Sequence, residues 1–500
     1  MRRIAVLDIG KTNAKVLVVD LATGAEAVLA RTPNTVVTCG PYPHHDMEML
    51  WQFALAGLKL AAVHGVDAVS ITTHGAACVL VDDRGALALP MLDYEHVGPD
   101  LLADEYDAVR PRFEETGSPR LPAGLNVGAQ VFWLARAFPA EFAKVRHVLM
   151  LAQYWSFRLS GVAASEATSL GCHTDLWNPW EGRFSSLVER MAWTGLFPPV
   201  RKATDVLGPV LPEVAAATGL PTGTPVLCGI HDSNASLVPH LEKAPCGVLS
   251  TGTWMIVMAL GGRAAELDAA RDVLVNVNAL GQPVPTARFM GGREMEEIMG
   301  GRIVEPSPGD LQLVLAGQVM AMPSLHPETG PFPGKRFGWI GSEPECGERM
   351  AAASFYAAFM GAECLSLAGA EGPVIVEGAF GGNLAFLRML ATATGRVVLG
   401  SGQGAGTGLG RRCWQDRCGR KGLRRWRSCR RAIRFGPDMS ALGGRRLHTG
   451  LLLDDFVTRR GVSARRRRSR TRSGQGRWNV SANGIATGEP SGFVAMMSPM

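Results

Sequence analysis

The chain has 500 residues, 46% of them hydrophobic, and a formal net charge of +6, which is enough apolar sequence for two or three globular domains. No apolar stretch approaches the roughly 18–20 residues of a membrane span, and the start Met1-Arg2-Arg3 precedes too short an apolar run for a signal peptide. The ten cysteines have no paired spacing, so we expect reduced thiols in a cytoplasmic protein that enters no membrane.

The chain opens with an apolar run that bends at a glycine, Val6-Leu7-Asp8-Ile9-Gly10-Lys11-Thr12-Asn13, and returns into the apolar run 14–19. The pattern is repeated as Val248-Leu249-Ser250-Thr251-Gly252-Thr253-Trp254, followed by the run 255–258. Each copy predicts a hairpin whose turn directs backbone N–H groups and hydroxyls at an anion. Two such hairpins that face each other can hold a polyphosphate, so the repeat predicts a two-lobed nucleotide enzyme.

Residues 1–245 are expected to form the first α/β domain. After the hairpin, the pattern predicts a helix near 46–64, strands near 67–73 and 78–82, and several helices between 100 and 192. The pair Val226-Leu227 begins the strand that closes this domain.

Residues 246–410 are expected to form a second domain, incomplete at its end. The predicted elements after the second hairpin are a long helix near 347–370, a strand at 374–376, a helix near 383–394 and a strand at 397–398. Two related α/β lobes imply a cleft between them, whose closure can exclude water.

Residues 411–500 differ in composition from the rest. They hold 22 Lys and Arg against 5 Asp and Glu, whereas residues 1–410 hold 29 against 40. This segment is rich in arginine, cysteine, tryptophan and glycine and has few acidic residues, which is the composition that a GC-rich gene yields when it is translated out of frame. We therefore interpret 411–500 as an out-of-frame or disordered tail. An arm that binds nucleic acid is the alternative that we rank lower.

The first hairpin carries candidate phosphate and metal ligands. Asp8 is placed to hold Mg²⁺ together with phosphates, because a hard cation prefers oxygen ligands and keeps most of its waters; its alternative role is turn capping. Lys11, Thr12 and Asn13 offer one positive charge and several donors to a transferring phosphate.

A third candidate lies between the hairpins, in Gly229-Ile230-His231-Asp232-Ser233-Asn234-Ala235. Phosphorylation of an alcohol needs a carboxylate near the hydroxyl, to orient it and to accept its proton late in the transfer. Asp232 is the candidate for this role. From spacing alone, an equally supported alternative is that Asp232 caps a helix over 233–240.

These motifs resemble, in the same order, those of the FGGY carbohydrate kinases, with Gly378-Ala379-Phe380-Gly381-Gly382-Asn383 as the last. The resemblance covers nearly all of residues 1–410. It implies the two-domain α/β fold of actin and hexokinase (ribonuclease H-like), ATP and Mg²⁺ as cofactors, and Asp232 as general base. Asp8 and Asp232 would hold the metal. The implied ATP-binding residues are Asp8, Gly10, Lys11, Thr12, Asn13, Thr251, Gly252, Thr253, Gly378 and Asn383.

Within the family, the segments 231–235 and 289–294 look like those of rhamnulose and fuculose kinases, which phosphorylate the 1-hydroxyl of 6-deoxy ketohexoses. The resemblance implies that His74, His231 and Asp232 contact the sugar; from the residues alone, an equally supported alternative for His74 is a histidine bonded to neighbouring backbone at a strand end. The segment 90–96 replaces a more common Trp-x-Asp-x-Arg pattern, so Asp93 or Glu95 could bind hydroxyls without the arginine partner. Gln153 is a further sugar candidate, or else a surface amide.

The sequence thus predicts an ATP-dependent kinase of a ketose such as L-rhamnulose or L-fuculose, with a small sugar as partner and no nucleic acid or membrane. Kinases of xylulose, ribulose or glycerol remain alternatives. A non-catalytic sugar sensor with a nucleic-acid-binding tail is the alternative from another class. The oligomeric state is left open, with a homodimer as one alternative.

Overall fold

The computed structural model describes residues 1–302, 304–401 and 433–435. The interpretation of residues 411–500 as an out-of-frame tail therefore lies outside the described residues, apart from the short strand β24 (Ile433–Phe435). The expected end of the second domain at residue 410 lies outside them as well.

The first seven-stranded sheet has the order β13-β14-β6-β1-β2-β3, and β15 also pairs with β6. The strands β1, β2 and β3 are antiparallel neighbours, whereas β6 runs parallel to β1 and β14 parallel to β6. The bounds are β1 (Arg3–Ile9), β2 (Asn13–Asp20), β3 (Ala25–Pro33), β6 (Ala68–Thr73), β13 (Val206–Pro209), β14 (Pro225–Leu227) and β15 (Ile230–His231). Strand β1 is apolar almost throughout because the sheet buries both of its faces.

The second seven-stranded sheet has the order β18-β19-β17-β16-β22-β23-β24. Its hairpin β16-β17 is antiparallel, β19 extends it in the same sense, and β22 runs parallel to β16. The bounds are β16 (Cys246–Thr251), β17 (Met255–Leu260), β18 (Val273–Val277), β19 (Pro283–Phe289), β22 (Val374–Gly378) and β23 (Val398–Gly400). The order β19-β17-β16-β22-β23 repeats the order β3-β2-β1-β6-β14 of the first sheet, so the motif repeat marks a repeat of topology.

Helices α1 (Met47–Val63), α6 (Leu151–Ser160) and α9 (Pro212–Thr218) pack on the first sheet and share its main core. Helix α1 begins where Asp46 caps it, because the carboxylate accepts a hydrogen bond from the backbone N–H of Met49 (2.9 Å). Its apolar face supplies Met47, Leu50 and Leu58 to the core. The remaining helices of residues 1–245 are α2 (Ala103–Asp107), α3 (Phe113–Thr116), α4 (Val127–Ala137), α5 (Pro139–Phe142), α7 (Ala167–Leu170), α8 (Ser186–Arg190) and α10 (Asp232–Leu237).

Two short strands, β7 (Cys78–Val81) and β8 (His147–Met150), form an antiparallel pair, and most of the helices between 103 and 190 surround a second core beside it. The other short paired strands of this region are β4 (Val36–Val37), β5 (His44–His45), β9 (Ser165–Glu166), β10 (Trp177–Asn178), β11 (Arg183–Phe184) and β12 (Val200–Arg201).

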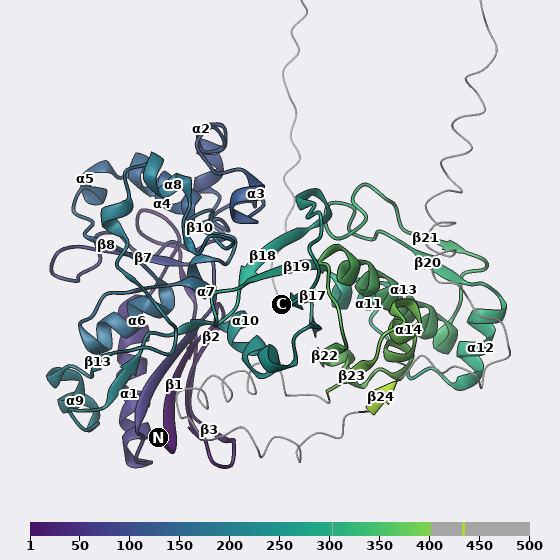
Figure 1. The fold of residues 1–500 in the computed structure, drawn as a ribbon, viewed down its shortest axis with the longest axis horizontal. Coiled ribbons are helices and arrows are strands. Elements are labelled where there is room, and N and C mark those ends of the chain that lie inside the picture. Colours follow the sequence, from purple (N-terminus) through teal and green to yellow (C-terminus); the bar gives the residue numbers. More distant parts are fainter. Residues whose placement is uncertain (303, 402–432, 436–500) are drawn as a thin grey trace, which may run out of the picture. The chain divides into compact units, whose positions relative to one another are not determined.

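In the second half of the chain, α11 (Gly291–Met299), α13 (Cys346–Leu367) and α14 (Leu384–Thr394) lie together beside the second sheet and bury one shared core (Figure 1). Helix α12 (Pro308–Ala316) and the strand pair β20 (Met320–Met322) and β21 (Gly338–Ile340) complete this part. Helix α13 is long and apolar enough to cross a bilayer, with a mean hydropathy of 1.3, but 67% of that window is buried within the protein. Its apolarity is that of a core helix.

Candidate functional site

The first hairpin lines a cavity of about 260 Å³ whose walls are Asp8, Gly10, Thr12, Asn13, Lys15, Arg31 and Asp232. The turn is closed by a hydrogen bond from the Gly10 N–H to the Asn13 carbonyl (2.9 Å), and the Asn34 side chain binds the Gly10 carbonyl (2.9 Å). The structure therefore brings together five of the predicted residues, namely Asp8, Gly10, Thr12, Asn13 and Asp232.

Two cations of this cavity, Lys15 and Arg31, were not among the predicted residues. Lys15 lies opposite Asp8 in the β1-β2 register and opposite Arg31 in the β2-β3 register, so the three side chains form a row across the sheet. The Lys15 Nζ is 3.7 Å from Asp8 Oδ2. The register of the predicted hairpin could have identified Lys15, because pairing Ile9 with Ala14 places Asp8 opposite Lys15.

The cavity fits a divalent cation bound with phosphates. Asp8 is largely buried, the side chain of Asp232 is 27% exposed, and both carboxylates line the same space as two cations. The described residues contain no cluster of three His, Cys, Asp or Glu that could hold a metal alone. Oxygen ligands from two carboxylates suit a hard cation that takes its other ligands from water and phosphate.

Lys11 lies elsewhere than predicted. Its ammonium forms an ion pair with Asp93, lies 3.9 Å from Glu95 Oε2, and sits 4.6 Å from the centre of the Tyr94 ring. It is not among the residues that line the cavity. Its contacts thus place the Lys11 charge on the segment 93–95 rather than on a phosphate, and they supply Asp93 with the cationic partner that this segment lacks in sequence.

Asp232 is the first residue of α10, and the residue before it, His231, takes the N-cap position without a side-chain capping bond. The predicted capping helix over 233–240 is instead α10, which ends at Leu237, followed by a 3₁₀ segment over Val238–Lys243. Burial, with a smaller contribution from the Asp8 charge and against the lowering influence of His74 and Ser233, raises the pKa of Asp232 to about 6. A carboxylate of this pKa can accept a proton near neutral pH.

His74 is a buried, neutral imidazole near Asp232. Its Nδ1 binds the Gly75 carbonyl (2.9 Å), and its Nε2 has no hydrogen-bond partner in the described part of the chain. Burial lowers the pKa of His74 to about 4, although the Gly75 carbonyl and the Asp232 charge act in the opposite direction. The imidazole therefore offers a hydrogen-bonding nitrogen rather than a charge.

His45, which the sequence analysis missed, lies beside this group. Its ring centre is 5.9 Å from that of His74, its Nε2 is 3.9 Å from Asp93 Oδ1, and its Nδ1 binds Asn34 Oδ1 (3.0 Å). Burial, together with the Lys11 charge and against the Asp93 charge, lowers the pKa of His45 to about 4. No sequence motif marks this residue, because strand β5, which holds it, has two residues and no periodicity.

Gln153 is buried, so the alternative of a surface amide is wrong. It is fully buried in α6, and its Nε2 donates to the carbonyls of Cys228 (3.1 Å) and Gly229 (3.2 Å). The amide thus supports the backbone that leads to His231 and Asp232, and its predicted contact with a sugar stays a prediction. Glu95, by contrast, is exposed and has the Lys11 contact described above.

The second hairpin also bends at a glycine, but its turn is one residue shorter, because Thr251 pairs with Met255 whereas Ile9 pairs with Ala14. The Gly252 N–H binds the Trp254 carbonyl (3.0 Å), and both Gly252 and Thr253 are exposed at the turn. The Thr251 hydroxyl donates to the Glu377 carbonyl and accepts from the Phe380 N–H (3.0 Å), so the predicted phosphate contact of this residue stays a prediction. That hydroxyl fastens the hairpin to the end of β22, which leaves Gly252 and Thr253 as the exposed donors.

Structural roles account for the two residues predicted to bind the nucleoside. Gly378 has a φ of +85°, and a Cβ there would lie 2.0 Å from the Thr251 carbonyl oxygen. Asn383 caps α14 by accepting from the Phe386 N–H (3.0 Å), and its amide donates to Ser354 Oγ (3.0 Å). Both residues shape the turn after β22, and their predicted contact with adenosine stays a prediction.

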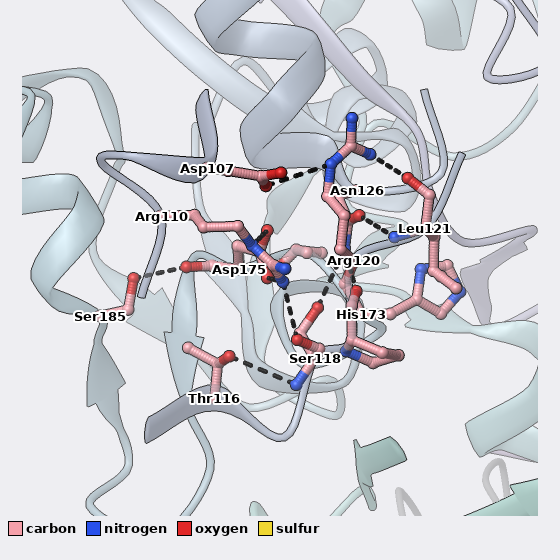
Figure 2. Close-up of polar contacts among 12 residues, drawn as sticks. Asp107, Arg110, Thr116, Ser118, Arg120, Leu121, Asn126, His173, Asp175 and Ser185 are labelled. Carbon is pink, nitrogen blue, oxygen red and sulfur yellow. Dashed lines mark hydrogen bonds and ion pairs between the residues drawn. The ribbon is translucent and has the colours of Figure 1, made fainter. Parts of the chain in front are cut away.

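A polar network surrounds His173 and Asp175 (Figure 2). The Arg110 guanidinium binds both oxygens of Asp175 (2.9 and 3.2 Å) and the Ser118 carbonyl (2.9 Å). The Asn126 amide donates to Ser118 Oγ (3.1 Å) and to the His173 carbonyl (2.9 Å). These bonds fix the backbone on both sides of residue 174, in the loop whose Cys172 Sγ lies 3.7 Å from His231 Nε2.

Comparison with known proteins gives two domain matches. Residues 106–239 match the N-terminal domain of the FGGY family of carbohydrate kinases, and residues 243–421 match the domain described as carbohydrate kinase FGGY, C-terminal. The L-fuculokinase of Escherichia coli (strain K12) is 27% identical over 286 residues, which are 53% of this chain and 58% of that protein. The rhamnulokinase of Pectobacterium atrosepticum is 25% identical over 276 residues, 51% and 53% of the two chains. The chain thus spans less than two thirds of the length of these curated relatives.

Among solved structures, a carbohydrate kinase from Novosphingobium aromaticivorans is 37% identical, with a TM-score of 0.80 over 93% of this chain and 99% of that one. A xylulose kinase from Rhodospirillum rubrum has a TM-score of 0.72 over 93% and 99% of the two chains at 19% identity, which bears on the fold alone. These likenesses confirm the predicted two-lobed α/β fold.

Proposed function

Because the chain belongs to the FGGY family of carbohydrate kinases, we propose that it transfers the γ-phosphate of MgATP to a hydroxyl group of a ketose in the cytoplasm. The observation that carries this proposal is the shared cavity of Asp8 and Asp232, with Lys15 and Arg31 in its wall. A phosphoryl transfer needs a carboxylate at the acceptor and positive charge at the phosphates, and this cavity has both.

Asp232 acts as the general base in this proposal. Its carboxylate orients the ketose hydroxyl and accepts the proton as the bond to phosphorus forms. With a pKa of about 6, Asp232 is mostly ionised at neutral pH and still basic enough to take the proton. The His74 ring is close enough for the two groups to influence each other's charge, and its buried Nε2, which has no hydrogen-bond partner in the described residues, is the atom proposed to meet a substrate hydroxyl once the sugar is bound.

The phosphates bind at the two hairpins. Lys15 and Arg31 balance their charge, and the backbone and side chains of Thr12, Asn13, Gly252 and Thr253 donate to their oxygens. Asp8 and Asp232 would hold Mg²⁺, which when bound neutralises charge on the transferring phosphoryl group.

The proposed substrate is a 6-deoxy ketohexose such as L-rhamnulose or L-fuculose, phosphorylated at the 1-hydroxyl. The similarity to an L-fuculokinase and a rhamnulokinase supports this class. The local charge supports a neutral sugar, because Asp93 and Glu95 offset the Lys11 charge and the imidazoles of His45 and His74 are neutral. Xylulose, ribulose and glycerol are the competing substrates to be tested beside it.

The experiment that tests the proposal is ketose-dependent release of ADP from ATP in the presence of Mg²⁺. We expect turnover with at least one 6-deoxy ketohexose and its loss in Asp232→Asn. The matched control is Asp83→Asn, an exposed aspartate in a turn, which keeps full turnover. Absence of ketose-dependent ADP release from the unaltered chain contradicts the proposal.

A further inference from the structure

One buried threonine, Thr168, bonds to the backbone of His231 before Asp232 and to the side chain of Asn234 after it. Its Oγ1 accepts the N–H of His231 (3.1 Å), and its carbonyl accepts the side-chain amide of Asn234 (3.4 Å). Thr168 is fully buried. Since α10 has no side-chain cap at its start, these bonds from a distant segment decide where the first residue of the helix lies.

The hydroxyl of Thr168 is itself oriented by a buried carboxylate. It donates to Glu166 Oε2 (2.6 Å), so its lone pairs are available to the His231 N–H. Glu166 also accepts the backbone N–H groups of Thr168 (3.0 Å) and Ser169 (3.1 Å) and is 2% exposed. With these donors in place the carboxylate has one orientation, and therefore the threonine hydroxyl does too.

Asn234 decides which ring nitrogen of His231 carries the proton. Its amide nitrogen must donate to the Thr168 carbonyl, which can only accept, and the same nitrogen lies 2.8 Å from His231 Nδ1. Nδ1 is thus an acceptor, and the proton of the neutral ring is on Nε2. The Nε2–H edge lies 3.3 Å from Asp232 Oδ1 and 3.7 Å from Cys172 Sγ.

The Gly75 backbone lies close to the same Nε2 edge of the His231 ring. A Cβ added at Gly75 would lie 2.7 Å from His231 Nε2 and 2.7 Å from Cys172 Sγ. Only a glycine at position 75 leaves space for this edge of the ring beside the Asp232 carboxylate.

We propose that Thr168 and Asn234 are positioning residues for Asp232, with Glu166 orienting the Thr168 hydroxyl and Asn234 holding His231 in its Nε2–H form. This inference rests on the proposed function of Asp232 as general base. It adds that the reactive geometry of the base is set by a segment, 166–169, whose residues are not among those that line the cavity.

The first test compares Thr168→Val with Thr168→Ser in the full chain. Valine removes the hydroxyl that accepts the His231 N–H, whereas serine keeps it. We expect the valine variant to lose about 100-fold in kcat, the cost of a misplaced reactive group, with the KM values for ATP and ketose nearly unchanged. Serine restores most of the rate.

The matched control is Thr218→Val. Thr218 is a buried threonine of α9 whose hydroxyl donates to the Val214 carbonyl (2.7 Å) and accepts the Leu220 N–H (3.3 Å). It makes the same kinds of bond away from the site, so its variant loses stability and keeps kcat. Equal kcat losses in Thr168→Val and Thr218→Val would show a structural role only and overturn the proposal.

The second test reads the His231 ring directly by ¹⁵N NMR of histidine-labelled protein, with His231→Gln for assignment. We expect a protonated Nε2 and a bare Nδ1 in the unaltered chain. Asn234→Asp, which is equal in size but can only accept, moves the proton to Nδ1 and lowers kcat. A proton on Nδ1 in the unaltered chain overturns the proposal.

These measurements distinguish a failure of the proposed function from a failure of the proposed positioning role. No ketose-dependent turnover in the unaltered chain defeats the proposed function, and the ring-nitrogen shifts then still decide the proton position without any substrate. Normal turnover combined with unchanged kcat in Thr168→Val defeats the positioning role alone. If the valine variant fails to fold, the comparison of Thr168→Ser, Asn234→Asp and the unaltered chain decides between the same outcomes.

Discussion

Asp8 and Asp232 line one cavity, although Asp8 lies in the first strand of the chain and Asp232 begins α10. The contact is electrostatic as well as spatial, because the Asp8 charge helps to raise the pKa of Asp232 after burial has raised it. Two carboxylates that disfavour each other's charge are stabilised by a cation between them. The proposed chemistry of the site depends on this relationship, and the following predictions test it.

Asp232→Asn should stabilise the fold at alkaline pH. The pKa of Asp232 is raised from 3.8 to about 6, so its contribution to folding is present below pH 3.8 and is lost as the pH rises through 6. An amide avoids that loss. We expect a gain of about 2 kcal/mol at pH 8 that shrinks toward pH 5, read from urea unfolding at both pH values. An equal change in the free energy of unfolding at both pH values would contradict a raised pKa of Asp232.

Loss of the cations in the cavity should weaken ATP binding. Lys15→Gln and Arg31→Gln each remove one positive charge from the wall of the cavity, and a charge-assisted contact of about 1.5 kcal/mol corresponds to about a 10-fold rise in the KM for ATP. Lys59→Gln, on the exposed face of α1, is the control. The prediction is wrong if the control and the two variants give the same KM.

Lys11 should act on the sugar rather than on ATP. Since its ammonium is paired with Asp93, Lys11→Met is expected to raise the KM for the ketose about 10-fold and to leave the KM for ATP nearly unchanged. Asp93→Asn should act in the same direction, and the double variant should be less than additive because the two groups share one interaction. A selective effect on ATP would return Lys11 to the phosphate role that the sequence predicts.

Gly378 should tolerate no side chain. Alanine there must adopt a φ of +85° with its Cβ 2.0 Å from the Thr251 carbonyl oxygen, and we expect a loss of at least about 3 kcal/mol. Gly395 has a φ of +64° with open space around it, so Gly395→Ala measures the backbone strain alone, about 1 kcal/mol. Thermal unfolding of both variants compares the two costs; equal losses would mean that the close approach to Thr251 has no energetic weight.

Acid should destabilise the fold through buried histidines. The pKa of His45 is lowered from 6.5 to about 4, so the stability that its neutral form contributes is present above pH 6.5 and is lost as the pH falls toward 4. His45→Gln should therefore reduce the loss of stability between pH 6.5 and pH 4.5. His64→Gln, at an exposed position after α1, should leave that loss unchanged.

The elements with strong patterns could be predicted from the sequence. The two hairpins, the helices observed as α1, α13 and α14, and the central strands all follow from apolar periodicity and from the repeated glycine turn. The antiparallel strands β18 and β19 and the short strands between 36 and 45 could not, because their pairing depends on neighbours far away in sequence.

The site shows the same limit at the level of single residues. Asp8, Gly10, Thr12 and Asn13 share one turn, so local sequence was enough to group them. Lys11 belongs to that turn as well, but its ammonium forms an ion pair with Asp93. Asp93 is distant in sequence and comes close to Lys11 only when the protein has folded. The burial of Gln153 and the hydrogen bond from the Thr251 hydroxyl to β22 likewise depend on tertiary structure, which local sequence does not reveal.

The most direct test of the account is to incubate the protein with MgATP and, separately, L-rhamnulose, L-fuculose, L-xylulose and no sugar, and to follow ADP and sugar phosphate together. The account predicts one sugar phosphate for each ADP, formed with a 6-deoxy ketohexose and absent without sugar or in Asp232→Asn. ADP without sugar phosphate, or equal turnover in Asp232→Asn, would contradict it.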